Sequence, residues 1–269
     1  EFRRVLFRSA RTVRGYLFVA NRNAANGGTT AKDSITATVT GSGLVCTQSS
    51  TICGKSIKVA ATGDYQFELQ GDGTGGTSSI TTTTLVSGST FTKSLTYYAS
   101  AAKTLTASVL TPVLGIGSND SAVAVTGVDA AGAVWGGTAY IYASAAADAT
   151  AVGGSATTPV ACVFRAANGT HYCPISATAA GTGSFKVIDA SAIASATATS
   201  NAVSVTSSNA VAATVKVAFD KASYAPYEKA LITVTPLDAS GKAIAAATFA
   251  NLFAAGGLVS NIGFASGFG

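Results

Sequence analysis

His171 is the only histidine in the chain and the natural candidate for a general base. It lies in the segment between Cys162 and Cys173, beside Tyr172, and no Gly-x-Ser-x-Gly nucleophile motif lies near it. A histidine without a nucleophile and an orienting partner gives no catalytic constellation. We therefore interpret His171 as a surface-loop residue and predict no catalytic residue in this chain.

The acidic segment 63–76 is the second place where chemistry could occur. Asp64, Glu68 and Asp72 recur every four residues, which places them on one face of a strand. Weak Ca²⁺ binding is one interpretation, but Ca²⁺ requires six to eight oxygens from converging loops. Residues 71–76 are glycine-rich but lack the lysine and helix of a phosphate cradle. They predict a hairpin turn between strands at 65–70 and 78–84, and we predict no metal site and no cofactor.

The four cysteines form two close pairs, Cys46 with Cys53 and Cys162 with Cys173. Six and ten residues intervene, whereas zinc half-sites have shorter spacings and histidine support. We interpret each pair as a local disulfide, with Cα atoms about 4.4–6.8 Å apart; buried free thiols are the alternative. Disulfides indicate an oxidising, extracytoplasmic compartment.

The elements that carry these residues form an internal repeat with an offset of 109 residues. Residues 122–132 align with 231–241 without a gap, and a weaker third copy covers 17–27. In the rear halves, 63–69 resembles 181–188, and each stretch follows a cysteine pair. We therefore expect the disulfide to be part of the repeat, placed just before the same late strand.

The local pattern is β throughout. Apolar and polar residues alternate at 34–40, 121–125 and 230–234, which is typical of strands with one buried face. The tetrads at 129–132 and 238–241 predict turns in which the aspartate caps its own turn. The alanine-rich runs 143–147 and 245–250 are interpreted as strand or loop, with a short helical turn at 245–254 as the alternative. The expected core residues are Val39, Phe67, Val123, Val125, Phe185, Val187, Leu231 and Val234.

Composition argues against a membrane-spanning protein and against a nucleic-acid-binding protein. Only 11% of residues are charged, 48% are apolar, and there is no run long enough to span a membrane. Residues 1–9 match an in-frame translation of a sequencing-library adapter, which implies a fragment from assembled metagenomic reads. Residues 1–14 carry five arginines, so the remainder is nearly neutral although the net charge is +5. The remainder shows no basic patch, and we predict no nucleic-acid partner.

The spacing of strands and turns predicts an all-β fold of tandem immunoglobulin-like antiparallel β-sandwiches. Residues 219–234, Phe-Asp-Lys-Ala-Ser-Tyr-Ala-Pro-Tyr-Glu-Lys-Ala-Leu-Ile-Thr-Val, together with the Asp-x-x-Gly turn at 238–241, resemble bacterial Ig-like (Big-type) repeats. Tyr227 stands where that family often has glycine. The serine, threonine and alanine content is similar to that of S-layer and other tandem-repeat cell-surface proteins. This resemblance covers most of 15–269 at the level of architecture.

The repeat predicts three domains after a disordered or artefactual 1–14. They are a partial domain at 15–88 without its first strands, a complete one at 89–206, and a partial one at 207–269 without its last strands. Both partial domains are expected to expose unpaired strand edges. Trp135 is interpreted as a core or domain-junction anchor, an exposed contact residue being the alternative.

The predicted function is that of a non-catalytic structural or adhesive protein, extracellular or at the cell surface and S-layer-like. Its expected partners are like copies of itself, other cell-envelope components and glycans. One alternative is a carbohydrate- or receptor-binding stalk of a larger exoprotein or phage structural protein, for which Tyr140 and Tyr142 are a candidate aromatic pair. Another is an accessory segment of a secreted enzyme.

Overall fold

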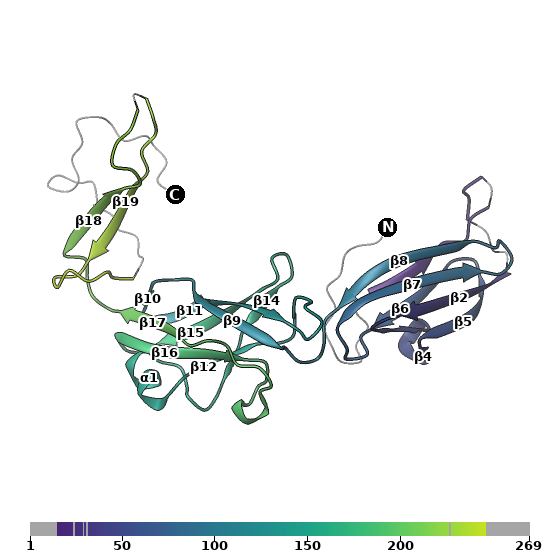
Figure 1. Cartoon of the computed structure of the whole chain (residues 1–269), viewed down its shortest axis with the longest axis horizontal. Coiled ribbons are helices and arrows are strands. Elements are labelled where there is room, and N and C mark those ends of the chain that lie inside the picture. The colour runs from purple at the N-terminus through teal and green to yellow at the C-terminus, as the bar shows by residue number, and fades with distance from the viewer. Residues whose placement is uncertain (1–14, 24, 29, 31, 226, 246–269) are drawn as a thin grey trace. The chain divides into compact units, whose positions relative to one another are not determined.

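The computed structural model describes residues 15–245 except 24, 29, 31 and 226. The first sandwich contains eight strands: β1 (Gly15–Val19), β2 (Lys32–Thr40), β3 (Leu44–Cys46), β4 (Cys53–Gly54), β5 (Ser56–Thr62), β6 (Tyr65–Gln70), β7 (Gly76–Thr84) and β8 (Thr90–Tyr97), with a 3₁₀ turn η1 (Gln48–Ser50). They form two antiparallel sheets, ordered β1-β6-β3-β4 and β5-β2-β7-β8 (Figure 1). The alternation predicted at 34–40 is that of β2, whose inward residues Ile35, Ala37 and Val39 are buried.

The second sandwich contains nine strands and one helix: β9 (Thr104–Val109), β10 (Val113–Gly115), β11 (Gly117–Val128), β12 (Tyr140–Ala143), α1 (Ala146–Ala151), β13 (Val160–Ala161), β14 (Val163–Arg165), β15 (Thr170–Ala177), β16 (Gly181–Ile188) and β17 (Val203–Ser208), with a 3₁₀ turn η2 (Ile193–Ser195). One sheet has the order β9-β11-β15-β14, and the other has the order β13-β12-β16-β17-β10. In chain order this is the strand arrangement of an immunoglobulin sandwich, with β10 added parallel to β17. The all-β, Ig-like fold predicted from the sequence is confirmed.

The third described segment, 209–245, contains β18 (Thr214–Phe219) and β19 (Ile232–Leu237), which pair antiparallel. No second sheet covers this hairpin among the residues described. The prediction that Leu231 is a core residue is therefore wrong, because its side chain is 66% exposed, and Val234 is only half-buried. The other six expected core residues are all buried in the two sandwiches.

Strand pairing changes one expected boundary. β8 pairs with β7 over its full length, from Thr90 opposite Thr83 to Tyr97 opposite Gly76. The first sandwich therefore extends to Tyr97, past the expected end at 88, because a ladder of backbone hydrogen bonds holds residues 90–97 to β7. The short helix α1 corrects a second expectation, since the alanine-rich run after β12 turns helical at Ala146. The helical-turn alternative at 245–254 lies almost wholly outside the described residues, as do residues 1–14.

The front halves of the three copies share one turn. In each, the side-chain oxygen of the first turn residue accepts hydrogen bonds from the backbone N–H groups two and four residues later: Asn23, Asp129 and Asp238. An isolated β-bridge closes each turn, between Arg22 and Gly28, Val128 and Val134, and Leu237 and Ala243. The predicted self-capped aspartate turns are confirmed, and the third copy uses asparagine for the same purpose.

The rear-half alignment of 63–69 with 181–188 is wrong. β6 pairs with β1. β16 instead pairs with β12 and β17, which form the other sheet of the sandwich, the one that does not contain β11. The position of β6 is instead taken by β15, which pairs with β11. Alternating residues identify a buried face but do not select the partner strand, because every inward-facing strand has the same period.

The turn before β19 adopts a backbone conformation that suits glycine. Tyr227 has φ 68°, and its side chain is fully exposed. Nearby, the Ala225 N–H donates to Glu228 Oε2 at 2.9 Å, and the Leu231 N–H donates to Asp220 Oδ1 at 2.9 Å. The backbone at Tyr227 lies in the left-handed region, which strains a residue that carries a Cβ.

Replacing Tyr227 with glycine is expected to stabilise the β18–β19 hairpin by about 0.5–1 kcal/mol, because the left-handed strain is removed and no packing is lost. Hydrogen exchange of the β18 and β19 amides would measure the change. Tyr227→Ala is the matched control, since it removes the ring but keeps the Cβ, and it is expected to give no gain. Equal protection in the glycine and alanine variants would contradict the explanation.

Candidate functional site

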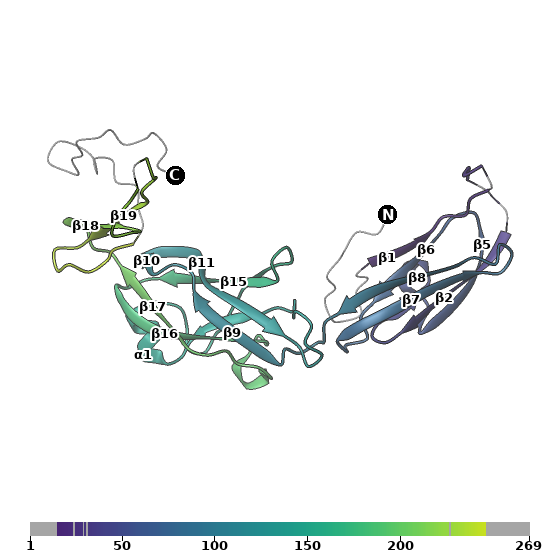
Figure 2. The same ribbon diagram turned by 45° about the horizontal axis from the view of Figure 1, so that its top comes forward.

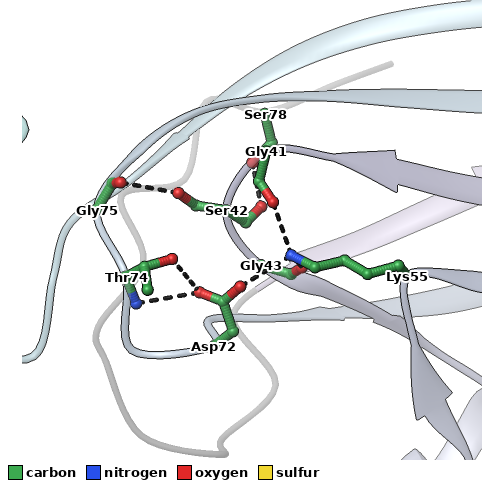
Figure 3. Close-up of polar contacts among 8 residues, drawn as sticks. All are labelled: Gly41, Ser42, Gly43, Lys55, Asp72, Thr74, Gly75 and Ser78. Atoms are coloured by element: carbon green, nitrogen blue, oxygen red, sulfur yellow. Dashed lines mark hydrogen bonds and ion pairs between the residues drawn. The ribbon is translucent and has the colours of Figure 1, made fainter.

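A cluster of polar contacts in the first sandwich surrounds Lys55, which lies between β4 and β5. We call it the Lys55 cluster, and it comprises Gly41, Ser42, Gly43, Lys55, Asp72, Thr74, Gly75 and Ser78 (Figure 3). The Lys55 ammonium donates to Gly41 O at 2.6 Å and to Gly43 O at 2.7 Å. It also forms an ion pair with Asp72 Oδ2 at 2.9 Å. All three N–H donors of the ammonium are used.

Two glycines turn their carbonyls toward Lys55. Gly41 and Gly43 have φ 89° and 87°, in the left-handed region. A Cβ on Gly41 would lie 2.6 Å from Thr77 O, and one on Gly43 would lie 2.4 Å from the Tyr97 ring. The loop between β2 and β3 therefore requires glycine at both positions, for conformation and for space.

Asp72 connects the 71–75 loop to Lys55. Its Oδ1 accepts from the Thr74 N–H at 3.0 Å and from the Thr74 hydroxyl at 2.6 Å. Partial burial raises the pKa of Asp72, but hydrogen bonds from Lys55 and Thr74 outweigh that effect and hold the pKa well below its ordinary value. The predicted hairpin at 71–76 is wrong, because β6 and β7 belong to different sheets and the loop crosses between them.

The Lys55 cluster is suited to holding loops together rather than to reacting. Forming an amide between Nζ and the Asp72 carboxyl would require a neutral amine and a protonated acid, and would release water. The lowered pKa of Asp72 keeps its carboxylate ionised, and an ionised carboxylate does not form an amide with an amine. Lys55 and Asp72 therefore form an ion pair in which every N–H donor of the Lys55 ammonium is used.

Tyr97 connects this cluster to the sandwich core. Its side chain is 1% exposed, and burial, with a smaller contribution from the Asp72 charge, raises the pKa of Tyr97 to about 12. The folded-state pKa thus lies above the ordinary value of 10. The stability that follows from this shift is fully present below pH 10 and is lost as the pH rises through 12.

We expect the first sandwich to lose about 2–3 kcal/mol of unfolding free energy between pH 10 and 12 through Tyr97 alone. Urea unfolding at a series of pH values, followed by hydrogen exchange of β7 and β8, would measure the slope. The comparison is Tyr97→Phe, which removes the titrating hydroxyl and should flatten this part of the slope. Identical slopes for the two chains would contradict the assignment.

The three acidic residues at four-residue spacing do not converge. Asp64 pairs with Arg22 at 2.9 Å, Asp72 pairs with Lys55, and Glu68 accepts from the Ser49 N–H at 3.1 Å. Each carboxylate therefore has a different protein partner. No group of three or more metal-ligating side chains occurs in the described part of the chain.

His171 lies in the core of the second sandwich, so its interpretation as a surface-loop residue is wrong. The strand β15 alternates, and its inward residues include His171 and Cys173, both 0% exposed. The His171 ring stacks on Trp135 at 5.4 Å and contacts Phe164 at 4.7 Å between ring centroids. Its Nε2 donates to Gly137 O at 2.8 Å. A ring so enclosed cannot reach a substrate.

Trp135 is a core residue, 1% exposed, which decides between the two interpretations left open by the sequence. The glycines that follow it make room for the aromatic cluster. A Cβ on Gly137 would lie 2.1 Å from the Trp135 indole, and one on Gly136 would lie 2.8 Å from the Phe164 ring. The Tyr98 hydroxyl donates to Gly136 O at 3.1 Å, which fixes the same turn.

Both cysteine pairs are disulfides, Cys46–Cys53 and Cys162–Cys173. Their Cα separations are 4.0 and 4.2 Å, slightly below the range expected. The reason for the first is that Cys46 and Cys53 lie directly opposite each other on β3 and β4. The expectation that both bridges precede the same late strand is wrong, because Cys53 lies on the edge strand β4 and Cys173 lies on β15 between β11 and β14.

Tyr140 and Tyr142 alternate with the buried Ile141 on β12, so both face outward and both are half-buried. β12 is flanked by β13 and β16, and Tyr142 lies opposite Lys186. The pair forms an aromatic strip on the outer face of its sheet. No helix in the described residues has the length and apolar character needed to cross a bilayer.

The fold places the chain in the class of tandem Ig-like β-sandwich proteins. No protein-family model and no curated protein sequence matches it. Among solved structures it matches invasin, titled a bacterial integrin-binding protein, with TM-score 0.31 and 13% identity over 89% of this chain and 46% of that one. The chain thus spans less than half the length of the invasin chain.

A second solved structure is the C-terminal domain of the Streptococcus agalactiae AgI/II polypeptide BspA, with TM-score 0.24 and 7% identity over 76% of this chain and 98% of that one. The TM-scores and sequence identities of both matches are low. The fold assignment rests on the strand pairing described above.

Proposed function

We propose that this chain is a non-catalytic structural or adhesive segment of a cell-surface protein, located outside the cytoplasm and acting through its sheet faces. The proposal rests on the observation that the potentially reactive side chains make contacts that hold the fold together. Lys55 and Asp72 tie loops together, His171 is enclosed by Trp135 and Phe164, and Asp129 caps its turn.

The two disulfides support the proposed location. Both join neighbouring strand segments within a sandwich, and such bonds persist in oxidising compartments. The low charge of the chain supports contact through neutral serine, threonine and alanine faces, as in S-layer-like assemblies. Like copies of the chain and other cell-envelope components are the proposed partners.

Bead clustering would test the adhesive role. Beads coated with the full chain are expected to cluster with one another, and clustering should change less than about twofold between low and high salt because few charges take part. Beads coated with the chain after reduction and alkylation of both disulfides are the control. Beads that never cluster, or whose clustering disappears at high salt, would overturn the proposal.

The outer strip of Tyr140 and Tyr142 favours a second candidate, a glycan-binding stalk. Paired aromatic rings that are partly exposed provide a stacking surface for sugar rings, with a polar handle at each tip. A glycan array probed with the full chain would test it. Binding that is lost in Tyr140→Ala/Tyr142→Ala but kept in the neighbouring Lys186→Ala chain would favour this candidate over homotypic adhesion.

A further inference from the structure

Two Asn-x-Ser/Thr triplets, the acceptor sequence for N-linked glycans, occur in the second sandwich. Residues 119–121, Asn-Asp-Ser, lie on β11, and residues 168–170, Asn-Gly-Thr, lie where the turn from β14 enters β15. β11 and β15 are neighbours in one sheet (Figure 2), and the two asparagines lie toward opposite ends of β15. Both triplets satisfy the pattern, so the surroundings of each amide decide which of them can react.

The Asn119 amide is used by the fold. Its Nδ2 donates to Gly115 O at 2.9 Å and to Gly117 O at 3.0 Å. It also donates at 3.3 Å to the carbonyl of Ile175, the residue opposite Asn119 on β15, and the side chain is half-buried. A primary amide has only two N–H hydrogens, so three acceptors leave neither of them free. A sugar on this nitrogen would replace one hydrogen and break at least one of these contacts.

The Asn168 amide is accessible. Asn168 is exposed, and it follows two exposed alanines, Ala166 and Ala167, whose small side chains leave space around it. Its Nδ2 donates to the Tyr172 hydroxyl at 2.8 Å. One N–H hydrogen is enough for this contact, so the other can be replaced by a sugar while the contact is kept. The folded turn is therefore compatible with a glycan at this position.

The same turn brings the third residue of the triplet to the first. The Thr170 N–H donates to Asn168 Oδ1, and the Thr170 hydroxyl donates to Asn168 O, both at 3.3 Å. The middle residue, Gly169, has φ 66°, and a Cβ there would lie 3.0 Å from Val134 Cγ1. Glycine is therefore required for this turn, which holds the hydroxyl beside an asparagine whose amide faces solvent.

We propose that Asn168 is an acceptor for an N-linked oligosaccharide and that Asn119 is not. The donor is an oligosaccharide joined through a diphosphate to a polyprenyl lipid. Asn168 Nδ2 bonds to the anomeric carbon of the first sugar, the bond from that carbon to the diphosphate oxygen breaks, and the lipid diphosphate leaves with the electron pair. The amide proton passes to a base of the transferase, and nothing is oxidised or reduced.

The inference rests on the location outside the cytoplasm proposed above and not on the adhesive role. Its experiment uses the purified chain in solution, and no contact between chains takes part in the reaction. Beads that never cluster would therefore overturn the adhesive role and leave this inference standing. An Asn168 that accepts no glycan would overturn this inference and leave the clustering result unchanged.

A glycan-transfer reaction on the folded, disulfide-bonded full chain tests the proposal. The chain is incubated with a polyprenyl-diphosphate oligosaccharide and an oligosaccharyltransferase that recognises Asn-x-Ser/Thr, and the products are mapped by peptide mass spectrometry. We expect at least about tenfold more modification at Asn168 than at Asn119, because reaction at Asn119 requires local opening of β11. An unmodified Asn168, in a reaction that modifies a short Asn-x-Thr peptide, would overturn the proposal.

Variants separate the triplet from its surroundings. Asp120→Gly/Ser121→Thr gives both positions the same Asn-Gly-Thr triplet, and Asn119 should remain at least about tenfold less modified because its amide is still held by the fold. Equal modification at the two positions would contradict the proposal.

A second pair of variants tests the acceptor triplet itself. Thr170→Ala removes the hydroxyl and should abolish modification of Asn168, whereas Thr170→Ser keeps a hydroxyl and should retain it. The fluorescence of Trp135, the only tryptophan, checks that the second sandwich is folded in each variant before the reaction. Modification of Asn168 that persists in Thr170→Ala would overturn the proposal.

Discussion

Replacing Trp135 with alanine is expected to lower the unfolding free energy of the second sandwich by about 4 kcal/mol. The indole is 1% exposed and packs against the His171 ring, over glycines that leave no room for another side chain. A truncation here opens a cavity that the β-sheets cannot close, since strand positions are fixed by their hydrogen-bond ladders. Hydrogen exchange of β11 and β15 in increasing denaturant would measure the loss.

The neighbouring Val134→Ala is the matched control for Trp135. Val134 is 45% exposed, so its truncation should change the unfolding free energy by less than about 0.5 kcal/mol. The amides of β2 and β7 in the first sandwich should keep their protection in both variants. Similar losses in the two variants would show that the aromatic cluster is not the centre of this core.

Removing the Cys162–Cys173 disulfide is expected to destabilise the second sandwich by about 3 kcal/mol, because the unfolded chain gains the entropy of an opened loop. The sequence separation is 11 residues, and Cys173 is fully buried, so Cys162→Ala/Cys173→Ala is preferable to serine at these positions. Trp135 is the only tryptophan, and its fluorescence reports unfolding of this sandwich alone. The midpoint of urea unfolding should fall accordingly.

The matched variant is Cys46→Ala/Cys53→Ala. Its loop is shorter, with a separation of 7, and it should lower the stability of the first sandwich by about 2.5 kcal/mol while leaving the Trp135 transition in place. A Trp135 transition that moves equally in both variants would show that the bonds do not act locally. The chain with both pairs intact serves as the reference.

Residue pattern was sufficient for the fold class and for local geometry. Alternating β-branched and polar residues predicted β2, β11 and β19, since a strand with one buried face has only one period. The aspartates at 129 and 238 predicted turns because their carboxylates reach the N–H groups of the next few residues. Close cysteine pairs indicated disulfides within each pair.

The position of His171 shows where such inference fails. A lone histidine among polar residues between two cysteines suggested a loop, yet β15 begins at Thr170 and turns this ring into the core. The same limit explains the wrong pairing of 63–69 with 181–188. Periodicity assigns a face to each strand, but the strand's neighbours follow from connections made far along the chain.

The sequence by itself determined that this protein is built of β-sandwiches with self-capped turns, local disulfides and few reactive groups. Each of these features depends on residues that are close together in the chain. Only the tertiary structure decided which strands pair, how Lys55 joins loops 41–43 and 71–75, and that the His171 ring lies in the core beside Trp135. These features join segments tens of residues apart, and they depend on sheet order, which alternation alone does not encode.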